Sequence, residues 1–293
     1  MYHTIAEYLD ALKKEMQGSD SALIQDALAD AREHLSMALE AAREKNSEVG
    51  EADALKAIIE EYGAPEETAA AYREIERRTT PSLKQAKKPA SFWGSVFGVY
   101  IDPRTWGSLL FMFITFVTGI IYFTWAVTGA SLSVSLLILI IGIPFLFLFL
   151  LSVQGLALLE GRLVEALLGV RMPRRPLFAQ PGLKWYQRLM ELLTDKHTWL
   201  SMLYMVFQLP LGTFYFVINV TLFAVALSMI AAPFVQIIER ISIITMNSQF
   251  IFLPGWAMIL MVAGGFVLLT VTMHLVRGIG WLHGRYAKWM LVS

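Results

Sequence analysis

The chain has 293 residues, of which 56% are hydrophobic and 16% are charged, and its formal net charge is zero. Soluble domains hold about 45–50% apolar and about 25% charged residues, so this composition indicates a membrane portion. The chain contains no cysteine, which excludes disulfides, cysteine-ligated metal centres and thiol nucleophiles.

Charge divides the chain into two parts. Up to Thr80 there are 18 Asp and Glu against 9 Lys and Arg, whereas from Pro81 onward there are 6 against 15. An acidic front and a basic, apolar remainder predict two regions with different surroundings. We expect an all-α protein with an N-terminal soluble helical bundle at 1–79, a basic linker at 80–90 and a polytopic membrane domain of four spans at 91–293.

The acidic front carries the periodicity and the end signals of four helices. Thr4 and Glu7 form a capping-box pattern before the first apolar stripe. Gly18 ends that helix, Gly63 suits the left-handed position after a third helix, and Pro65 suits the first turn of a fourth. About 75–80 residues of this kind can bury a modest core.

Three short motifs of this front region carry a family resemblance. They are Tyr8-Leu9-x-x-Leu12, Asp30-x-x-x-His34-Leu35 and Tyr62-Gly63-Ala64-Pro65-Glu66-Glu67. The region resembles the HAAS signalling domain, a family that joins a cytosolic helical module to membrane helices, often beside PadR-like transcription regulators. The resemblance implies a cytosolic protein partner, such as a transcription regulator. The family's usual Leu-Pro after the first helix is replaced by Gly18-Ser19-Asp20.

The acidic face of the bundle is the candidate docking surface for such a partner. The candidate docking residues are Glu33, His34, Glu66 and Glu67. The alternative is that this face is only solvated and that His34 is an ordinary surface histidine near Asp30.

The linker at 80–90 is basic and carries two prolines, which break any continuous helix. Lys84, Lys87 and Lys88 precede the first span, where they fit attraction to anionic lipid on the cytoplasmic side. Direct nucleic-acid binding is not expected, because the cluster is small and the preceding domain is acidic.

Four apolar spans are expected in the second part, at about 107–128, 132–159, 199–230 and 253–276. Each exceeds the roughly 20 residues that cross a bilayer. Lys and Arg gather before the first span, between the second and third, and after the fourth, whereas the two opposite loops hold only Arg240. The positive-inside tendency therefore predicts a multi-pass protein of the plasma membrane with both termini cytoplasmic.

The membrane part repeats itself, at about 91–175 and 184–293. A shift of 93 positions superposes Asp102, Thr105 and Trp106 on Asp195, Thr198 and Trp199, and a later shift of 123 superposes Gly161-Arg162 on Gly284-Arg285. An even number of spans per repeat makes the two repeats parallel. Asp102 and Asp195 are expected to cap the helices that follow them.

The order of motifs in the membrane part carries a second resemblance. An Asp-x-x-Thr-Trp entry, the Ile141-Gly142-Ile143-Pro144 break and the Leu159-Glu160-Gly161-Arg162-Leu163 exit resemble the "putative sensor" membrane domain of actinobacterial histidine kinases and stand-alone proteins. The resemblance implies a sensory role without naming a ligand.

Two sets of membrane residues are candidates for function. The second repeat holds about 30 extra residues around 233–254, whose pattern favours a helix over a strand, and we expect either a lid or sensor there or a structural plug. The candidate sensing residues are Asn219, Gln236, Glu239 and Arg240. Glu160 is expected to form a structural ion pair with Arg162 or Arg277, the alternative being a proton relay.

No catalytic, nucleotide-binding or metal-binding motif occurs in the sequence, so neither enzymatic activity nor a cofactor is expected. We interpret the protein as a membrane sensor or regulator that acts through a cytosolic partner. A small transporter or lipid-handling protein is the alternative, since internal repeats and broken helices also occur in transporters. The sequence leaves a homo-oligomer open.

Overall fold

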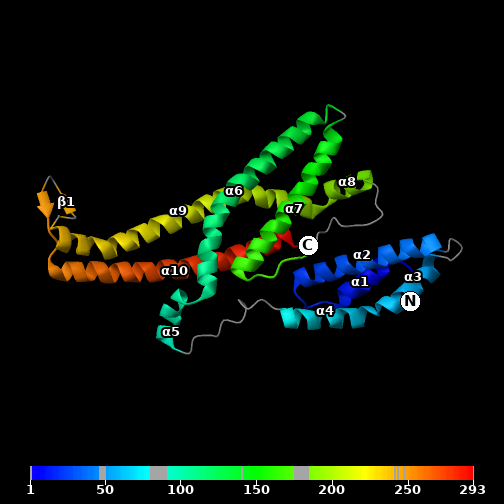
Figure 1. The fold of residues 1–293 in the computed structure, drawn as a ribbon, viewed down its shortest axis with the longest axis horizontal. Helices are drawn as coiled ribbons and strands as arrows, with labels where there is room; N and C mark the ends of the chain where they lie inside the picture. The colour runs from blue at the N-terminus through cyan, green and yellow to red at the C-terminus, as the bar shows by residue number, and fades with distance from the viewer. Residues whose placement is uncertain are drawn as a thin grey trace. The chain divides into compact units, whose positions relative to one another are not determined.

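The computed structural model describes residues 2–45, 51–79, 91–139, 141–174, 185–240, 242, 244–246 and 249–292. The linker at 80–90 lies outside these residues. The described chain is almost entirely helical, as the sequence predicts (Figure 1). It also contains a two-stranded antiparallel sheet, which an all-α prediction does not include.

The N-terminal bundle consists of α1 (Ile5–Glu15), α2 (Ser21–Lys45), α3 (Glu51–Tyr62) and α4 (Pro65–Thr79). Its core is built on Tyr8, Leu12 and Leu35, which are fully buried. The Tyr8 hydroxyl donates to the Gly63 carbonyl at 3.0 Å, which ties α1 to the turn between α3 and α4. Gly63 has a φ of 108°, the left-handed geometry that its place after α3 predicts.

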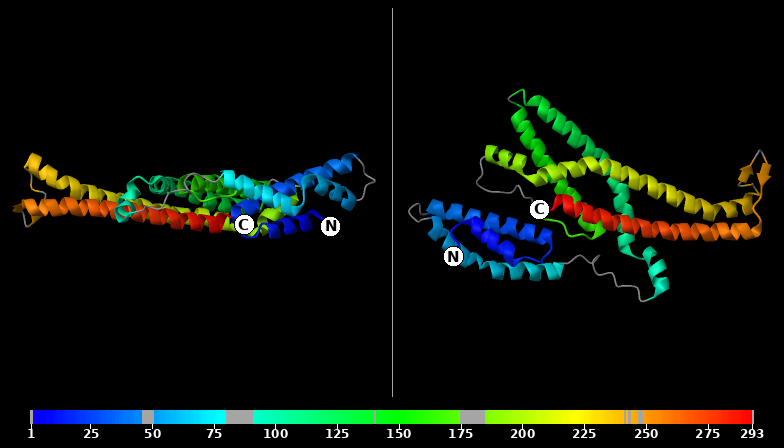
Figure 2. Two further views of the ribbon diagram at one scale, coloured as in Figure 1. Left: turned by 90° about the horizontal axis from the view of Figure 1, so that it is seen from below. Right: turned by 180° about the vertical axis from the view of Figure 1, so that it is seen from behind.

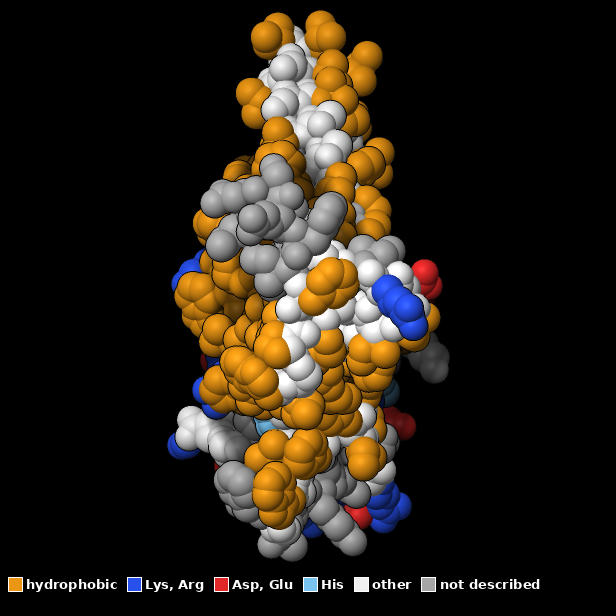
Figure 3. All heavy atoms as spheres, turned by 90° about the vertical axis from the view of Figure 1, so that its left-hand side faces the viewer, with side chains coloured by type: hydrophobic (Ala, Val, Ile, Leu, Met, Phe, Trp, Pro, Cys, Tyr) orange, Lys and Arg blue, Asp and Glu red, His pale blue; other side chains and the backbone are white. Residues whose placement is uncertain are grey.

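The membrane part begins with α5 (Phe92–Phe97) and the 3-10 turn η2 (Gly98–Tyr100), followed by α6 (Pro103–Leu136) and α7 (Gly142–Leu168). The second half consists of α8 (Trp185–Thr194), α9 (Lys196–Glu239), strands β1 (Ile244–Met246) and β2 (Gln249–Ile251), and α10 (Gly255–Leu291). Helices α6, α7, α9 and α10 are each long and apolar enough to cross a membrane. On the face drawn in Figure 3, hydrophobic side chains cover most of the described surface, as expected of helices that contact lipid.

The boundary between the first two spans is a correction to the sequence prediction. The predicted break at 129–131 is helical, and the turn lies instead between Leu136 and Gly142. Gly129 is helical and lies against Phe149, whose ring would be 2.1 Å from an added Cβ, so a larger side chain would not fit here. Pro144 lies in the first turn of α7, where a proline costs no intrahelical hydrogen bond.

The insertion at 233–254 contains both helix and strand. Helix α9 continues through Pro233 to Glu239, so helix is correct for the first part and wrong for the second, where β1 and β2 pair antiparallel. Gly265 of α10 lies close enough to α9 that an added Cβ would be 2.7 Å from Ile230, and both views in Figure 2 show the two helices side by side as they approach the hairpin. The hairpin therefore closes the far end of an antiparallel helix pair.

The chain forms two compact units, and it passes between them within α6, α9 and α10. The first unit comprises Met1–Gln85, Tyr122–Val206 and Gly284–Ser293, and the second comprises Ala86–Ile121 and Phe207–His283. In the membrane part, the first unit thus joins the second half of the first predicted repeat to both ends of the second. The second unit joins the beginning of the first repeat to the middle of the second.

The cores of the two units correspond to one another through the sequence repeats. The first unit packs Tyr122, Val153 and Met205 together. The second packs Tyr215, Val276 and Met112 together, and these are the same three repeat positions. The two cores therefore use the same three positions of the predicted repeats.

Candidate functional site

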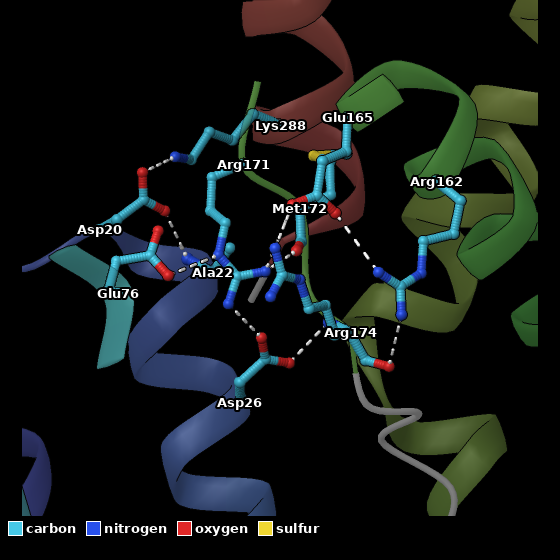
Figure 4. A network of polar contacts seen from close by, with 10 residues as sticks. All are labelled: Asp20, Ala22, Asp26, Glu76, Arg162, Glu165, Arg171, Met172, Arg174 and Lys288. Carbon is cyan, nitrogen blue, oxygen red and sulfur yellow. Dashed lines mark hydrogen bonds and ion pairs between the residues drawn. The ribbon is translucent and has the colours of Figure 1, made fainter. Parts of the chain in front are cut away.

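A buried arginine within the first unit connects the N-terminal bundle to the segment that follows α7 (Figure 4). The Arg171 side chain is only 3% exposed. Its Nη2 lies 2.8 Å from an oxygen of Asp26 in α2, and its Nε lies 3.2 Å from Glu76 in α4. Its Nη1 lies 3.6 Å from Glu165 in α7 and donates to the Met172 carbonyl at 2.8 Å. One guanidinium therefore links three helices.

The local backbone explains how Arg171 reaches the bundle. Gly169 has a φ of 68°, a left-handed conformation that ends α7 and turns the chain away from the helix axis. Met172 is fully buried and packs against Gly161 of α7, which fixes the segment on the helix. Between these two anchors, the side chain of Arg171 points to α2 and α4.

Two further basic residues extend the contact. The Arg174 backbone N–H donates to Asp26 at 2.6 Å, and its guanidinium contacts Glu165 at 3.0 Å. Lys288, in the last turn of α10, lies 2.6 Å from Asp20, whose other oxygen accepts from the Ala22 backbone at the start of α2. We call Arg171, Arg174 and Lys288 the basic patch, and the state in which these contacts are made the docked state.

The burial of Arg171 determines what the network can do. An arginine out of water is tolerated only when carboxylates and hydrogen bonds replace its hydration. Asp26 and Glu76 belong to the bundle, so their withdrawal would leave Arg171 with Glu165 as its carboxylate partner and with the rest of its guanidinium to be hydrated or paired anew. A network of this kind favours two discrete states over gradual loosening.

The entrances of the two repeats share their local contacts. Asp102 accepts from the Arg104 backbone at 3.1 Å, and Asp195 accepts from the His197 backbone at the same distance. Trp106 and Trp199 each donate from the indole to the carbonyl six residues earlier, at 2.8 and 2.9 Å. Asp102 and Asp195 therefore cap α6 and α9, as the sequence predicts.

Comparison with protein families identifies the membrane part. The family described as "Putative sensor" matches residues 111–291, which is more than half of the chain. The chain belongs to this sensor family. Comparison with curated proteins and with solved structures finds no match. The bundle at 1–79 lies outside the matched residues, so its likeness to the HAAS domain stays a prediction.

The predicted ion-pair residues make the following contacts, and an ion pair of Glu160 with Arg162 or Arg277 stays a prediction. Arg162 contacts Glu165 at 3.4 Å, and Arg277 contacts Asp102 at 3.3 Å. Glu160 is 1% exposed and accepts a hydrogen bond from Tyr204 at 3.0 Å. The equivalent position in the second repeat is His283, which shares a 3.1 Å hydrogen bond with Tyr215.

The predicted sensing residues of the sensor domain lie at different places along α9. The Asn219 amide is buried and donates to the Tyr215 carbonyl and to Met112 Sδ. Gln236 is buried and both donates to and accepts from the Leu253 backbone, at 3.0 and 3.1 Å. Glu239 and Arg240 are exposed at the end of the helix, where Arg240 has a φ of 52°. Only the last three belong to the junction with the hairpin.

Three of the predicted docking residues, His34, Glu66 and Glu67, lie at or near the turn between α3 and α4, whereas the basic patch contacts other acidic residues of the bundle. His34 is exposed and stacks on Tyr62 at 4.7 Å. Glu67 accepts from the Ala64 backbone at 3.4 Å, while Glu33 is half-buried and Glu66 is exposed.

Sequence reasoning gives Asp20 the role of a helix cap and counts Arg171 among the basic residues between the second and third spans. It gives no role to Asp26 or Glu76. One signal was present: Asp26 stands among the apolar positions Leu23 and Ala27, so a carboxylate occupies the inward face of α2. No group of three or more potential metal ligands occurs within the part of the chain that the structure describes.

Proposed function

We propose that this member of the sensor family is a regulator without an output enzyme of its own, and that it relays the state of its membrane helices through its N-terminal bundle. The observation that carries the proposal is the contact of Arg171 with Asp26, Glu76 and Glu165. A change that moves the end of α7 acts on α2 and α4 through one side chain.

The cellular setting forms part of the proposal. The distribution of Lys and Arg supports a plasma-membrane protein with both termini cytoplasmic. The bundle then faces the cytosol, where it binds a protein partner such as a PadR-like regulator and contacts no nucleic acid directly. The stimulus acts where α9 ends, at the point where Gln236 joins α9 to the chain beyond the hairpin and Glu239 and Arg240 are exposed.

The docked state can be measured directly. The chain has no cysteine, so Met37→Cys in α2 and Leu159→Cys in α7 can be spin-labelled without background, and both side chains are exposed. Double electron–electron resonance on the full chain in nanodiscs should give one narrow distance distribution. Arg171→Gln should broaden it, because the bundle carboxylates lose their buried cation. Arg162→Gln is the matched control, since Arg162 contacts Glu165 and the Arg174 carbonyl but neither α2 nor α4.

The output is tested by photo-crosslinking in cells from position 67 or 33, with mass spectrometry of the adducts. We expect adducts with a transcription regulator or another signalling protein, and a several-fold difference in yield between the wild type and Arg171→Gln. If the wild type and Arg171→Gln both give adducts only with a second copy of this chain, the bundle is instead an assembly element.

A further inference from the structure

The basic patch and the acidic surface that covers it come from different parts of the chain. Arg171, Arg174 and Lys288 follow or end the apolar helices α7 and α10. Asp20, Asp26 and Glu76 belong to the bundle. The pairing therefore joins a bundle to residues that the membrane helices hold in place whether or not the bundle is present.

The residues around the patch place it at the headgroup layer of a bilayer. Lys288 is followed by Trp289, which is 71% exposed, and Trp281 two turns earlier is also exposed. Tryptophan prefers the membrane–water interface, and a basic residue at the end of an apolar helix extends toward the headgroups. The acidic residues of the bundle therefore occupy sites that lie within reach of lipid phosphates.

We propose that the basic patch binds the headgroup phosphate of an anionic phospholipid, in competition with the carboxylates of the bundle. The guanidinium groups of Arg171 and Arg174 present paired donors that match a phosphate as well as a carboxylate. Lys288 supplies a point charge beside them. This inference rests on the proposed function, because release of the bundle has consequences only if the bundle signals.

Exposure sets the order of events. The side chains of Arg174 and Lys288 are 37% and 27% exposed in the docked state, whereas Arg171 is 3% exposed. A headgroup can therefore reach Arg174 and Lys288 first. It displaces Asp20 from Lys288 and binds the Arg174 guanidinium in competition with Glu165. Arg171 becomes accessible when α2 leaves and takes Asp26 with it.

The competition is tested with the full chain in nanodiscs, using the spin labels at positions 37 and 159. Discs of phosphatidylcholine alone are compared with discs that contain 30% phosphatidylglycerol. The released fraction should rise on the order of tenfold with the anionic lipid, since several basic side chains respond together. An unchanged distance distribution overturns the competition. Release in phosphatidylcholine discs on adding inorganic phosphate alone would overturn the assignment to a lipid.

Binding is tested separately, with a photoactivatable phosphatidylglycerol and mass spectrometry of the labelled peptides. We expect adducts near residues 171–174 and 285–291 that fall about tenfold in the Arg174→Gln/Lys288→Gln variant. Arg285→Gln removes a similar charge one turn earlier in α10 and should leave the labelling near 171–174 unchanged. If Arg285→Gln lowers the labelling as much as Arg174→Gln/Lys288→Gln does, the loss follows from the overall charge, and the proposed site is overturned.

The bundle side of the competition has its own variant. Asp20→Asn/Asp26→Asn should release the bundle in phosphatidylcholine discs and raise lipid labelling of the patch, and a fall in labelling would contradict the competition.

If the lipid experiments fail while Arg171→Gln still changes the crosslinks made in cells, the proposed function stands without lipid control. If the lipid experiments succeed and the crosslinks do not change, the lipid site stands and the proposed function falls.

Discussion

Gly119 and Gly212 occupy equivalent positions of the two repeats, and each lies against the backbone of the helix that carries the other. An added Cβ on Gly119 would lie 2.7 Å from the Gln208 carbonyl oxygen, and one on Gly212 would lie 2.5 Å from the Thr115 carbonyl oxygen. Thr115 and Gln208 are themselves equivalent positions. Helices α6 and α9 therefore cross through a reciprocal contact that only glycine permits at this distance.

Alanine at either glycine should destabilise the membrane domain. The clash is with backbone, which cannot rotate away as a side chain can, so overpacking should cost about 1–3 kcal/mol. Thermal unfolding in detergent measures the effect for Gly119→Ala and Gly212→Ala. Gly155→Ala and Gly278→Ala are matched controls, because these glycines are also equivalent by the repeat and nothing lies within 4 Å of an added Cβ. Equal losses at all four positions would contradict the reciprocal contact.

Two of the three cations of the basic patch, Lys288 and Arg171, should differ in how strongly they hold the bundle. The pair of Lys288 with Asp20 is partly exposed, so Lys288→Gln should change the ratio of docked to released chains by no more than about fivefold. Arg171→Gln leaves buried carboxylates without their cation and should change the ratio by about a hundredfold or more. The spin-label distances at positions 37 and 159 report both ratios, and similar effects for the two variants would argue against Arg171 as the principal contact.

Gln236 should hold the hairpin against the end of α9. Its amide satisfies both backbone groups of Leu253, and Gln236→Ala leaves that N–H and C=O without their partner. A lost buried amide of this kind costs about 1–3 kcal/mol, so amide hydrogens of β1 and β2 should exchange about tenfold faster or more. Hydrogen-exchange mass spectrometry makes the comparison with Glu239→Ala, which alters an exposed side chain three residues later. Unchanged exchange in Gln236→Ala would show that the hairpin is held by other contacts.

Alkaline pH should destabilise the N-terminal bundle through Tyr72. Burial and the hydrogen bond that the Tyr72 hydroxyl donates to Asp30 raise the pKa of Tyr72 above its ordinary value of 10.0. The folded state therefore keeps the Tyr72 proton at a pH at which the unfolded state loses it. The contribution of Tyr72 to the free energy of unfolding is complete below pH 10 and declines as the pH rises beyond it. Thermal unfolding of the full chain followed by circular dichroism should show a smaller alkaline loss in Tyr72→Phe. Part of the loss should remain, because burial also raises the pKa of Tyr8.

Local contacts were predictable from the sequence. Thr4 accepts from the Glu7 backbone at 3.2 Å, and Asp102 and Asp195 cap their helices, because each partner lies two or three residues away. The four spans were predictable for a related reason, since an apolar run of this length satisfies its own backbone and can lie in lipid. The resemblance to the sensor family likewise depended on the order of motifs along the chain.

Only the tertiary structure decided where the functional contacts lie. Arg171 meets Asp26 and Glu76 across separations of 145 and 95 residues. The local pattern places Asp26 on the inward face of α2, but it does not show which cation the carboxylate meets. The turn between α6 and α7 lies beyond Leu136 and not at 129–131, where Gly129 is helical and packs against Phe149. The sequence determined which segments are helical, capped and apolar, because those properties are local. Packing decided which charges are buried together, because the desolvation of an arginine depends on every helix that surrounds it.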